Sequence, residues 1–430
     1  MFFRILRWTG LTLLAGVTLL VASSCTMLGL NYASLDTANK SAPVPALDLD
    51  RLITPDGRAE AMKMLEDTLY GPWPKDLPVS MSDWRIINAA YLEGRGTLEE
   101  RDITIGLGPG AQTFQLVAAF PKGAFANPLV LSQTFSGNCD VFPGEAVTSA
   151  AGDPCSAQDT NSTANFIVNN LFGEFIAEAP IGKYFDAGLV YSSFHAGDFV
   201  PDSTQLAPQT MAALGGEVNP TSTLMAWAYA ISAALDALEK DPRIDPGHLS
   251  VMGHSRHGKA ALLATIWDPR IEAVVAHQSG FAGASLSRSA TGERLERMAE
   301  TYPHWLAPGA LKYAANPSLL PFDQHLVLAL IAPRRVFLGN GRRDVWSDPN
   351  SSFRAAQAAS EAWAAYGVRG LSEGSMRTFD PGAGIVWWLR LGGHSIVEED
   401  IDAFIGFLKA GIAPSAVSPP AELPSPPAPG

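Results

Sequence analysis

Short apolar runs and longer helix-prone segments alternate along the middle of the chain. Five apolar runs have the length and composition of buried strands, at residues 129–133, 187–193, 249–252, 271–276 and 335–338. The helix-prone segments lie at residues 221–238, 260–264, 353–365 and 398–408. This alternation predicts an α/β fold, in which helices cover both faces of a mainly parallel sheet.

The segment that precedes this alternation has a different pattern. Residues 59–69 have the spacing of an amphipathic helix. Residues 84–120 contain several β-prone runs separated by glycines, and they predict an N-terminal antiparallel hairpin region. We therefore expect a single folded domain over residues 49–411.

The two ends of the chain lack the regular spacing of apolar residues that forms a core. Residues 25–48 are rich in Ser, Thr, Ala and Pro, which predicts a tether. Residues 412–430 are rich in Pro and Ala, which predicts a disordered tail.

The first 24 residues have the layout of an export signal. Arg4 and Arg7 precede an apolar run over residues 11–22, which is too short to span a bilayer, and small residues follow it. The sequence Ala22-Ser23-Ser24-Cys25 resembles a bacterial lipobox, in which the cysteine carries the lipid. We expect a periplasmic or cell-surface protein whose only membrane contact is a lipid on Cys25, with ordinary signal cleavage as the alternative.

Composition narrows the class of protein. Hydrophobic residues make up 47% and charged residues 17% of the 430 residues, which is typical of a globular protein with a large core. A formal net charge of −13 argues against nucleic acid as a partner. Apart from Cys25, the chain has Cys139 and Cys155, and export to an oxidising compartment favours a disulfide between them. Two buried free thiols remain the alternative.

The stretch Gly253-His254-Ser255-Arg256-His257-Gly258-Lys259 lies between a strand-like run and a helix-prone run. A serine between glycines at such a junction is typical of the nucleophile elbow, where a sharp turn exposes the hydroxyl. The usual pattern is G-x-S-x-G, whereas the second glycine here comes one place later. We predict Ser255 to be a nucleophile.

A serine nucleophile needs a base and an acid that orients the base. In the chain order Ser, acid, His, the base is His394, in a glycine loop beyond the last predicted strand. The loop after residue 338 offers two acids, Asp344 and Asp348. We favour Asp344, because Asp348 precedes Pro349 and can equally be a turn residue.

Two cations follow the nucleophile directly. Helical side chains lean toward the N-terminus, so Arg256 and Lys259 can both face the site of attack, where they suit an oxyanion and a carboxyl-derived substrate. The alternative is that both form ordinary ion pairs. The loop at residues 134–138 is of the kind that supplies an oxyanion-hole amide.

From about Leu69 to Leu408 the chain resembles the bacterial glucuronoyl esterases of carbohydrate esterase family 15. The elbow has the delayed glycine of that family, and further motifs occur in order: 135–138, 197–198 with 201–202, 279–283, 292–293, 303–305, 320–325, 331–334, 344–349 and 393–394. The resemblance implies an α/β-hydrolase fold and a serine esterase. Its substrate would be an ester between the carboxyl group of a glucuronic acid on xylan and an alcohol such as one in lignin.

The resemblance also implies roles for individual residues. Arg256 would assist the oxyanion hole, while Lys259, Glu293, Trp346 and Trp305 would hold the sugar. No metal or organic cofactor is implied, and we expect a monomer.

The chain departs from the family at one position. Many members carry the triad acid as a glutamate before Ser-Gly, and this chain has Gln278 there. Asp344 would then have to supply the charge, or activity is reduced. Two other functions stay open: an esterase for acetyl xylan or acyl esters, and a surface lipoprotein that binds carbohydrate without turnover.

Overall fold

The computed structural model describes residues 44–75, 77–123, 126–148, 152, 155, 169, 171–214, 221–371 and 375–412. The predicted export signal, Cys25, most of the predicted tether and nearly all of the predicted tail lie outside these residues. No helix in the described ranges has both the length and the apolar character needed to cross a bilayer.

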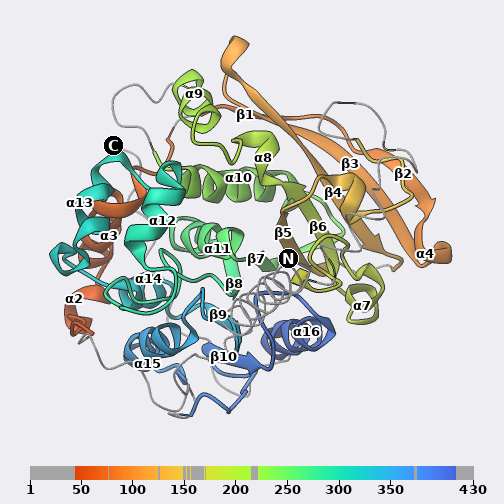
Figure 1. Ribbon diagram of the computed structural model, residues 1–430. Helices are drawn as coiled ribbons and strands as arrows, with labels where there is room; N and C mark the ends of the chain where they lie inside the picture. The colour runs from red at the N-terminus through yellow and green to blue at the C-terminus, as the bar shows by residue number, and fades with distance from the viewer. Residues whose placement is uncertain are drawn as a thin grey trace, which may run out of the picture.

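One twisted sheet runs through the molecule (Figure 1). It has ten strands in the order β1-β3-β4-β6-β5-β7-β8-β9-β10, with β2 paired to β3. The strands are β1 Val79–Met81, β2 Arg85–Ala90, β3 Gly96–Ile105, β4 Gln112–Pro121, β5 Asn127–Thr134, β6 Val190–His195, β7 Ile244–His254, β8 Ile271–His277, β9 Arg335–Gly341 and β10 Ile385–Arg390.

The sheet has an antiparallel and a parallel part. Strands β1 to β4 pair antiparallel, and β4 is also antiparallel to β6. From β6 through β5, β7, β8 and β9 to β10, every pairing is parallel. This is the predicted α/β-hydrolase arrangement, with the N-terminal antiparallel region at one edge.

Helices cover both faces of the sheet. One core packs under α3, α10, α11, α14 and α15, and the other under α7 and α16. The helices are α2 Leu49–Leu52, α3 Pro55–Leu65 continued by a π-helical turn Glu66–Tyr70, α4 Tyr91–Gly94, α5 Asn138–Val141, α7 Ile181–Asp186, α8 Ala196–Phe199, α9 Leu206–Ala213, α10 Thr223–Leu238, α11 Arg256–Trp267, α12 Leu295–Thr301, α13 Leu311–Ala315, α14 Gln324–Ala329, α15 Pro349–Ala365 and α16 Glu398–Ile412.

Three features of the fold differ from the sequence-based expectations. Strand β10 occupies residues 385–390, where we expected irregular structure, and it pairs along its whole length with β9. Helix α15 starts at Pro349 rather than at residue 353, because Asp348 caps it. Val44 and Leu47 pack against the core, so the folded domain starts before the predicted boundary at residue 49.

Candidate active site

The turn between β7 and α11 forces Ser255 into an unusual backbone conformation. Its φ is 53° and its ψ is −121°, a region that side chains rarely occupy. A Cβ at Gly253 would lie 2.2 Å from the backbone of His257, and one at Gly258 would lie 3.0 Å from the oxygen of Gly253. Close approach therefore requires glycine at 253, and the tight contact at 258 places the delayed second glycine in the same turn.

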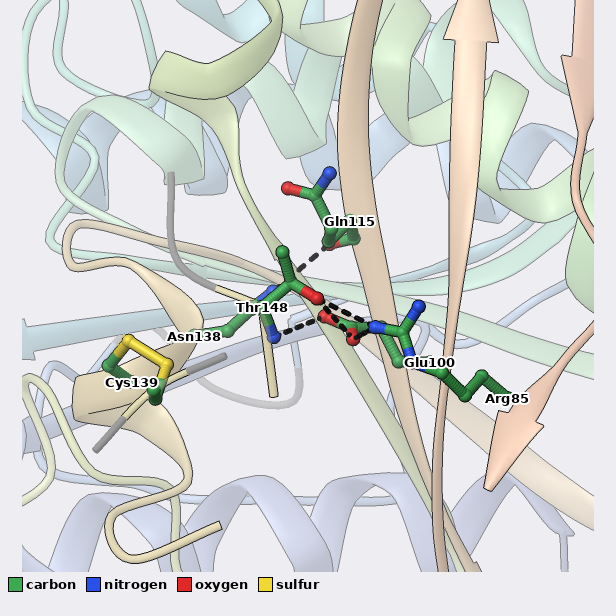
Figure 2. Close-up of a disulfide and its surroundings, with 7 residues drawn as sticks. Arg85, Glu100, Gln115, Asn138, Cys139 and Thr148 are labelled. Carbon is green, nitrogen blue, oxygen red and sulfur yellow. Dashed lines mark hydrogen bonds and ion pairs between the residues drawn. A yellow bond between two sulfur atoms is a disulfide. The ribbon is translucent and has the colours of Figure 1, made fainter. Parts of the chain in front are cut away.

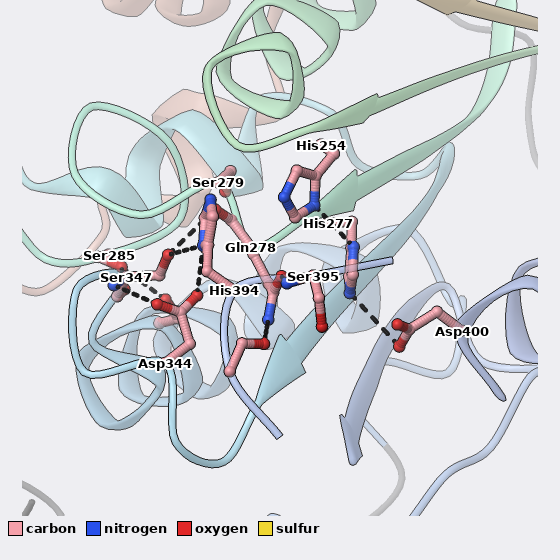
Figure 3. Close-up of polar contacts among 12 residues, drawn as sticks. His254, His277, Gln278, Ser279, Ser285, Asp344, Ser347, His394, Ser395 and Asp400 are labelled. Carbon is pink, nitrogen blue, oxygen red and sulfur yellow. Dashed lines mark hydrogen bonds and ion pairs between the residues drawn. The ribbon is translucent and has the colours of Figure 1, made fainter. Parts of the chain in front are cut away.

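Parallel pairing brings the predicted base and acid to the same edge of the sheet as Ser255. Asp344 follows β9 and His394 follows β10, two neighbouring strands. Nδ1 of His394 lies 2.8 Å from Oδ2 of Asp344 (Figure 3). The ring of His394 lies 4.6 Å, centroid to centroid, from that of His254, the residue next to Ser255. Asp344 and His394 thus lie together beside the elbow that carries Ser255.

Asp344 is only 3% exposed, and its surroundings favour its charged form. Burial alone would raise the pKa of Asp344, but the charge and hydrogen bond of His394 lower it below its usual value, with help from Ser347. The Ser347 amide donates to Oδ1 of Asp344 at 3.2 Å. A buried carboxylate held in this way fixes the tautomer of the imidazole and stabilises its protonated form.

Asp348, the alternative acid, has structural contacts instead. Its Oδ1 accepts the backbone N–H of Ser351 at 3.2 Å, which caps α15. Its Oδ2 accepts the hydroxyls of Ser289 at 2.5 Å and Thr291 at 2.7 Å. The geometry therefore favours Asp344 as the partner of His394.

Arg256 forms an ion pair with Asp202. The ion pairing given above as the alternative is thus present for Arg256, through Nη1 of its guanidinium. Nε of Arg256 is buried and has no hydrogen-bond partner in the described part of the chain. Because Arg256 immediately follows Ser255 and its side chain is 30% exposed, its guanidinium is a cation suited to an oxyanion that forms at the elbow.

Asp202 was not predicted as a site residue, although it fixes Arg256 in place. Its Oδ1 accepts from Trp305 Nε1 at 2.7 Å and lies 2.7 Å from His304 Nε2. Burial of Asp202 opposes its charge, yet the bond to His304, the charge of Arg256 and the bond from Trp305 together lower its pKa to about 2. Asp202 is 54 residues from Arg256 in the sequence, so no local pattern shows the pairing.

Lys259 is 3% exposed and points into the interior of the site. Its Nζ donates to the backbone oxygen of Ser279 and lies 5.9 Å from the centre of the Trp305 ring. Burial lowers the pKa of Lys259 to about 8, although the charge of Glu293 opposes the shift. The ammonium is therefore poised to lose its proton in the mildly alkaline range.

Glu293 and Trp346 line the candidate active site next to Lys259. Glu293 is 4% exposed, its N–H donates to the Trp346 oxygen at 2.9 Å, and burial raises the pKa of its carboxyl. The Trp346 side chain also hydrogen-bonds Glu293, yet it is 41% exposed and lies 5.0 Å from the guanidinium of Arg297. A cation, an acid and an exposed aromatic face suit a hydroxyl-rich sugar ring.

Trp305, which is also predicted to hold the sugar, is as buried as Lys259 and Glu293. The side chain is 4% exposed and stacks on Tyr302, with 3.9 Å between ring centres. The guanidinium of Arg256 lies 5.1 Å from its ring. Trp305 therefore packs against the cationic groups of Arg256 and Lys259.

Two buried imidazoles lie behind His394 (Figure 3). Nδ1 of His254 is 3.0 Å from Nδ1 of His277, whose Nε2 lies 3.4 Å from Oδ1 of Asp400. Burial, with the charges of His394 and His277, lowers the pKa of His254 well below its usual value. His254 is thus neutral when it packs against His394.

The loop after β5 is tied to the rest of the molecule (Figure 2). Cys139 and Cys155 form the predicted disulfide, with a Cα–Cα distance of 5.6 Å. Asn138 Nδ2 donates to the Gln115 oxygen at 3.3 Å, and buried Glu100 accepts from the amide of Thr148 at 2.9 Å. The loop at residues 134–138 lies at the elbow, because the Phe135 ring is 4.6 Å from that of His257.

Among the described residues, no three or more His, Cys, Asp or Glu side chains are grouped in a way that could hold a metal ion.

Comparison with known proteins finds consistent matches. A family model described as glucuronyl esterase, fungi, matches residues 180–367. A curated carbohydrate esterase from an unknown prokaryotic organism is 27% identical over 402 residues, which cover 88% of this chain and 91% of that protein. The 4-O-methyl-glucuronoyl methylesterase of Hypocrea jecorina is 28% identical over 271 residues, or 60% of this chain and 57% of that protein.

Solved structures agree with these matches. A promiscuous esterase of carbohydrate esterase family 15 from a marine bacterial metagenome superposes with a TM-score of 0.74 at 25% identity, over 88% of this chain and 98% of that one. The glucuronoyl esterase from Solibacter usitatus superposes with a TM-score of 0.71 at 27% identity, over 87% and 96%.

Proposed function

We propose that this chain, which is similar to glucuronoyl esterases and to an esterase of carbohydrate esterase family 15, hydrolyses esters of the glucuronic acid carboxyl group through Ser255, His394 and Asp344. The observation that carries the assignment of residues is the 2.8 Å contact between His394 and Asp344 beside the nucleophile elbow. Esters of 4-O-methyl-glucuronic acid on xylan, including those with lignin alcohols, are the proposed natural substrates.

Acylation begins when His394 accepts the proton of the Ser255 hydroxyl through Nε2. The serine oxygen attacks the C6 carbonyl of the uronate ester, and negative charge develops on the carbonyl oxygen. Arg256, through its side chain and its backbone amide, stabilises that charge, a contribution of about 3–4 kcal/mol where such donors have been removed. His394 then gives its proton to the departing alcohol, which leaves the uronate bound to Ser255.

Deacylation repeats the same steps with water. His394 takes a proton from a water molecule, which attacks the acyl carbon, and the proton returns to the Ser255 oxygen as the uronate leaves. Asp344 keeps Nδ1 of His394 protonated throughout, because its carboxylate accepts that N–H at 2.8 Å.

The walls of the site would select the acyl side of the ester. Lys259, Glu293 and Trp346 offer a cation, a carboxyl and an exposed indole to the sugar ring and its hydroxyls. Buried, charged groups of this kind disfavour a fatty-acyl chain, since binding it would leave them without polar partners.

The specificity test compares three ester classes on the same preparation. We expect hydrolysis of benzyl glucuronate well above a Ser255→Ala blank, with little release from acetylated xylan or a fatty-acyl ester. Cleavage of the acetyl or fatty-acyl ester alone would overturn the proposal and favour an esterase of other specificity. No cleavage of any ester would favour a binding protein.

The lowered pKa of Lys259 predicts a pH effect on substrate binding. Its ammonium is intact below a pH of about 8 and is lost as the pH rises through that value. We therefore expect KM for benzyl glucuronate to rise several-fold between about pH 7 and pH 9, because a charged donor to the substrate is lost. Steady-state kinetics across this range measures the rise.

A Lys259→Met variant provides the control for this effect. Its KM should be high at neutral pH and should change little up to pH 9. If the rise persists in Lys259→Met, another group is responsible for it.

We also propose that the protein is exported, that Cys25 carries a lipid, and that the enzyme acts as a monomer in breakdown of plant cell walls. The charged, apolar and small-residue segments of residues 1–25 support the first two statements. The disulfide between Cys139 and Cys155 supports an oxidising compartment.

A further inference from the structure

Gln278 is the first residue after β8, at the same edge of the sheet as the proposed triad. It is 1% exposed, and its φ of 48° is rare for a residue other than glycine. Its N–H donates to the oxygen of Gly339 at 2.8 Å, and its own oxygen accepts the hydroxyl of Ser347 at 3.2 Å. The backbone of Gln278 is therefore fixed by the strand that leads to Asp344.

The side chain of Gln278 uses both halves of its amide on the loop that carries His394. Nε2 donates to the oxygen of Gly393 at 2.8 Å, and Oε1 accepts the N–H of Ser395 at 3.0 Å (Figure 3). These are the two residues that flank His394. The contact needs one donor and one acceptor in the same planar group, which a carboxamide has and an ionised carboxylate lacks.

Arg390 holds the same loop from its other side. Its Nη2 donates to the oxygen of Ser395 at 2.5 Å and to the Ser395 hydroxyl at 2.8 Å. Its Nε donates at 2.6 Å to Asp400, which is fully buried. Arg390 thus ties the loop to α16, while Gln278 ties it to the end of β8, the strand beside β9.

We propose that Gln278 is a positioning residue, whose neutral amide holds the backbone on both sides of His394 so that the imidazole stays in line between Asp344 and Ser255. This inference rests on the proposed role of His394 as the base. A glutamate at this position would keep the bond from Ser395. Once ionised, however, it would place a lone pair against the oxygen of Gly393, so residue 278 would lose one of its two ties to the loop.

The test combines kinetics with a measurement that needs no substrate. In Gln278→Ala and, at pH 8, in Gln278→Glu, we expect kcat for benzyl glucuronate to fall by about 10–100-fold with KM nearly unchanged, because a displaced base slows chemistry more than binding. In the free enzyme, the low-field proton resonance of the hydrogen bond between His394 Nδ1 and Asp344 should broaden or vanish, and the amide of Ser395 should exchange faster.

Gln324→Ala is the matched control. Gln324 is also fully buried, and its amide is also bonded on both sides, with Nε2 donating to Ser287 at 3.1 Å and Oε1 accepting from Tyr70 at 3.0 Å. This variant should lose stability but retain kcat and the low-field resonance. A Gln278→Ala or Gln278→Glu enzyme with the kcat and the resonance of the parent would overturn the proposal.

Failure of the proposed function can be told apart from failure of the positioning role of Gln278. If the parent enzyme cleaves no glucuronate ester, the proposed function fails, while the resonance and the exchange rate in Gln278→Ala still report on the position of His394. If the parent cleaves the ester and these two signals do not respond to Gln278→Ala, the positioning role alone is refuted.

Discussion

Replacement of Ser255 by alanine is expected to lower kcat for benzyl glucuronate by about 10⁶-fold, the scale on which other serine hydrolases lose activity without the nucleophile. The hydroxyl is the atom that forms the acyl bond, and the neighbouring Ser279, only 3% exposed, lies on a different strand end and cannot replace it in the elbow. Single-turnover and steady-state assays measure the loss. A variant that retained more than about a hundredth of the activity would exclude Ser255 as the nucleophile, because removal of a serine nucleophile costs far more activity than this.

The backbone of the elbow makes a second variant informative. Ser255 has a φ of 53° and a ψ of −121°, a conformation that glycine adopts without the cost that a Cβ imposes. Ser255→Gly should be as inactive as Ser255→Ala, yet its free energy of unfolding should exceed that of Ser255→Ala by about 1 kcal/mol. Denaturant unfolding of the two inactive variants compares them directly. Equal stability would show that the turn carries no such strain.

The residues proposed as nucleophile, acid and base could be named from local patterns and from their order along the chain. The glycines at 253 and 258 indicate a tight turn, and the parallel strands on either side place the loops that follow them at one edge of the sheet. The loop after β9 places Asp344 at that edge, whereas His394 follows from the chain order Ser, acid, His, because β10 itself was not predicted. The sequence therefore predicts Asp344 and His394 without any knowledge of their distance.

Strand β10 was missed for a physical reason. Its six residues, Ile385–Arg390, lie between glycine-rich segments. The residues on either side therefore show no regular spacing of apolar positions that would mark a strand. The assignment of these six residues as a strand depends on pairing with β9 from Ile385 with Val336 onward, a partner 49 residues earlier in the chain. Alternate residues then enter different cores, with Trp387 on the side of α15 and Val386 on the side of α16.

The supporting residues could not be predicted from spacing. Asp202 contacts Arg256 across 54 residues, and Gln278 contacts Ser395 across 117 residues. In both cases the role depends on which atoms come within hydrogen-bond distance after folding. At position 278 the sequence showed only that a carboxylate is missing, whereas the folded chain shows two specific hydrogen bonds made by the amide that replaces it.

Asp344→Asn is expected to lower kcat by about 10⁴-fold with little change in KM, the loss seen when the acid of a serine triad becomes an amide. The amide can donate its N–H to Nδ1 of His394, now 2.8 Å from the carboxylate, and would then hold the imidazole in the tautomer whose Nε2 cannot accept the serine proton. Steady-state kinetics on benzyl glucuronate measures the loss.

Asp348→Asn is the matched control, since it makes the same chemical change four residues later in the chain. Asp348 caps α15 and accepts two hydroxyls, so its variant should lose about 1 kcal/mol of stability and keep kcat within a few-fold of the parent. The opposite result, a large loss in Asp348→Asn and a small one in Asp344→Asn, would move the acid to Asp348. If both variants stayed active, the chemistry would require no carboxylate in this loop, and the charge on His394 would have to be stabilised from elsewhere in the site.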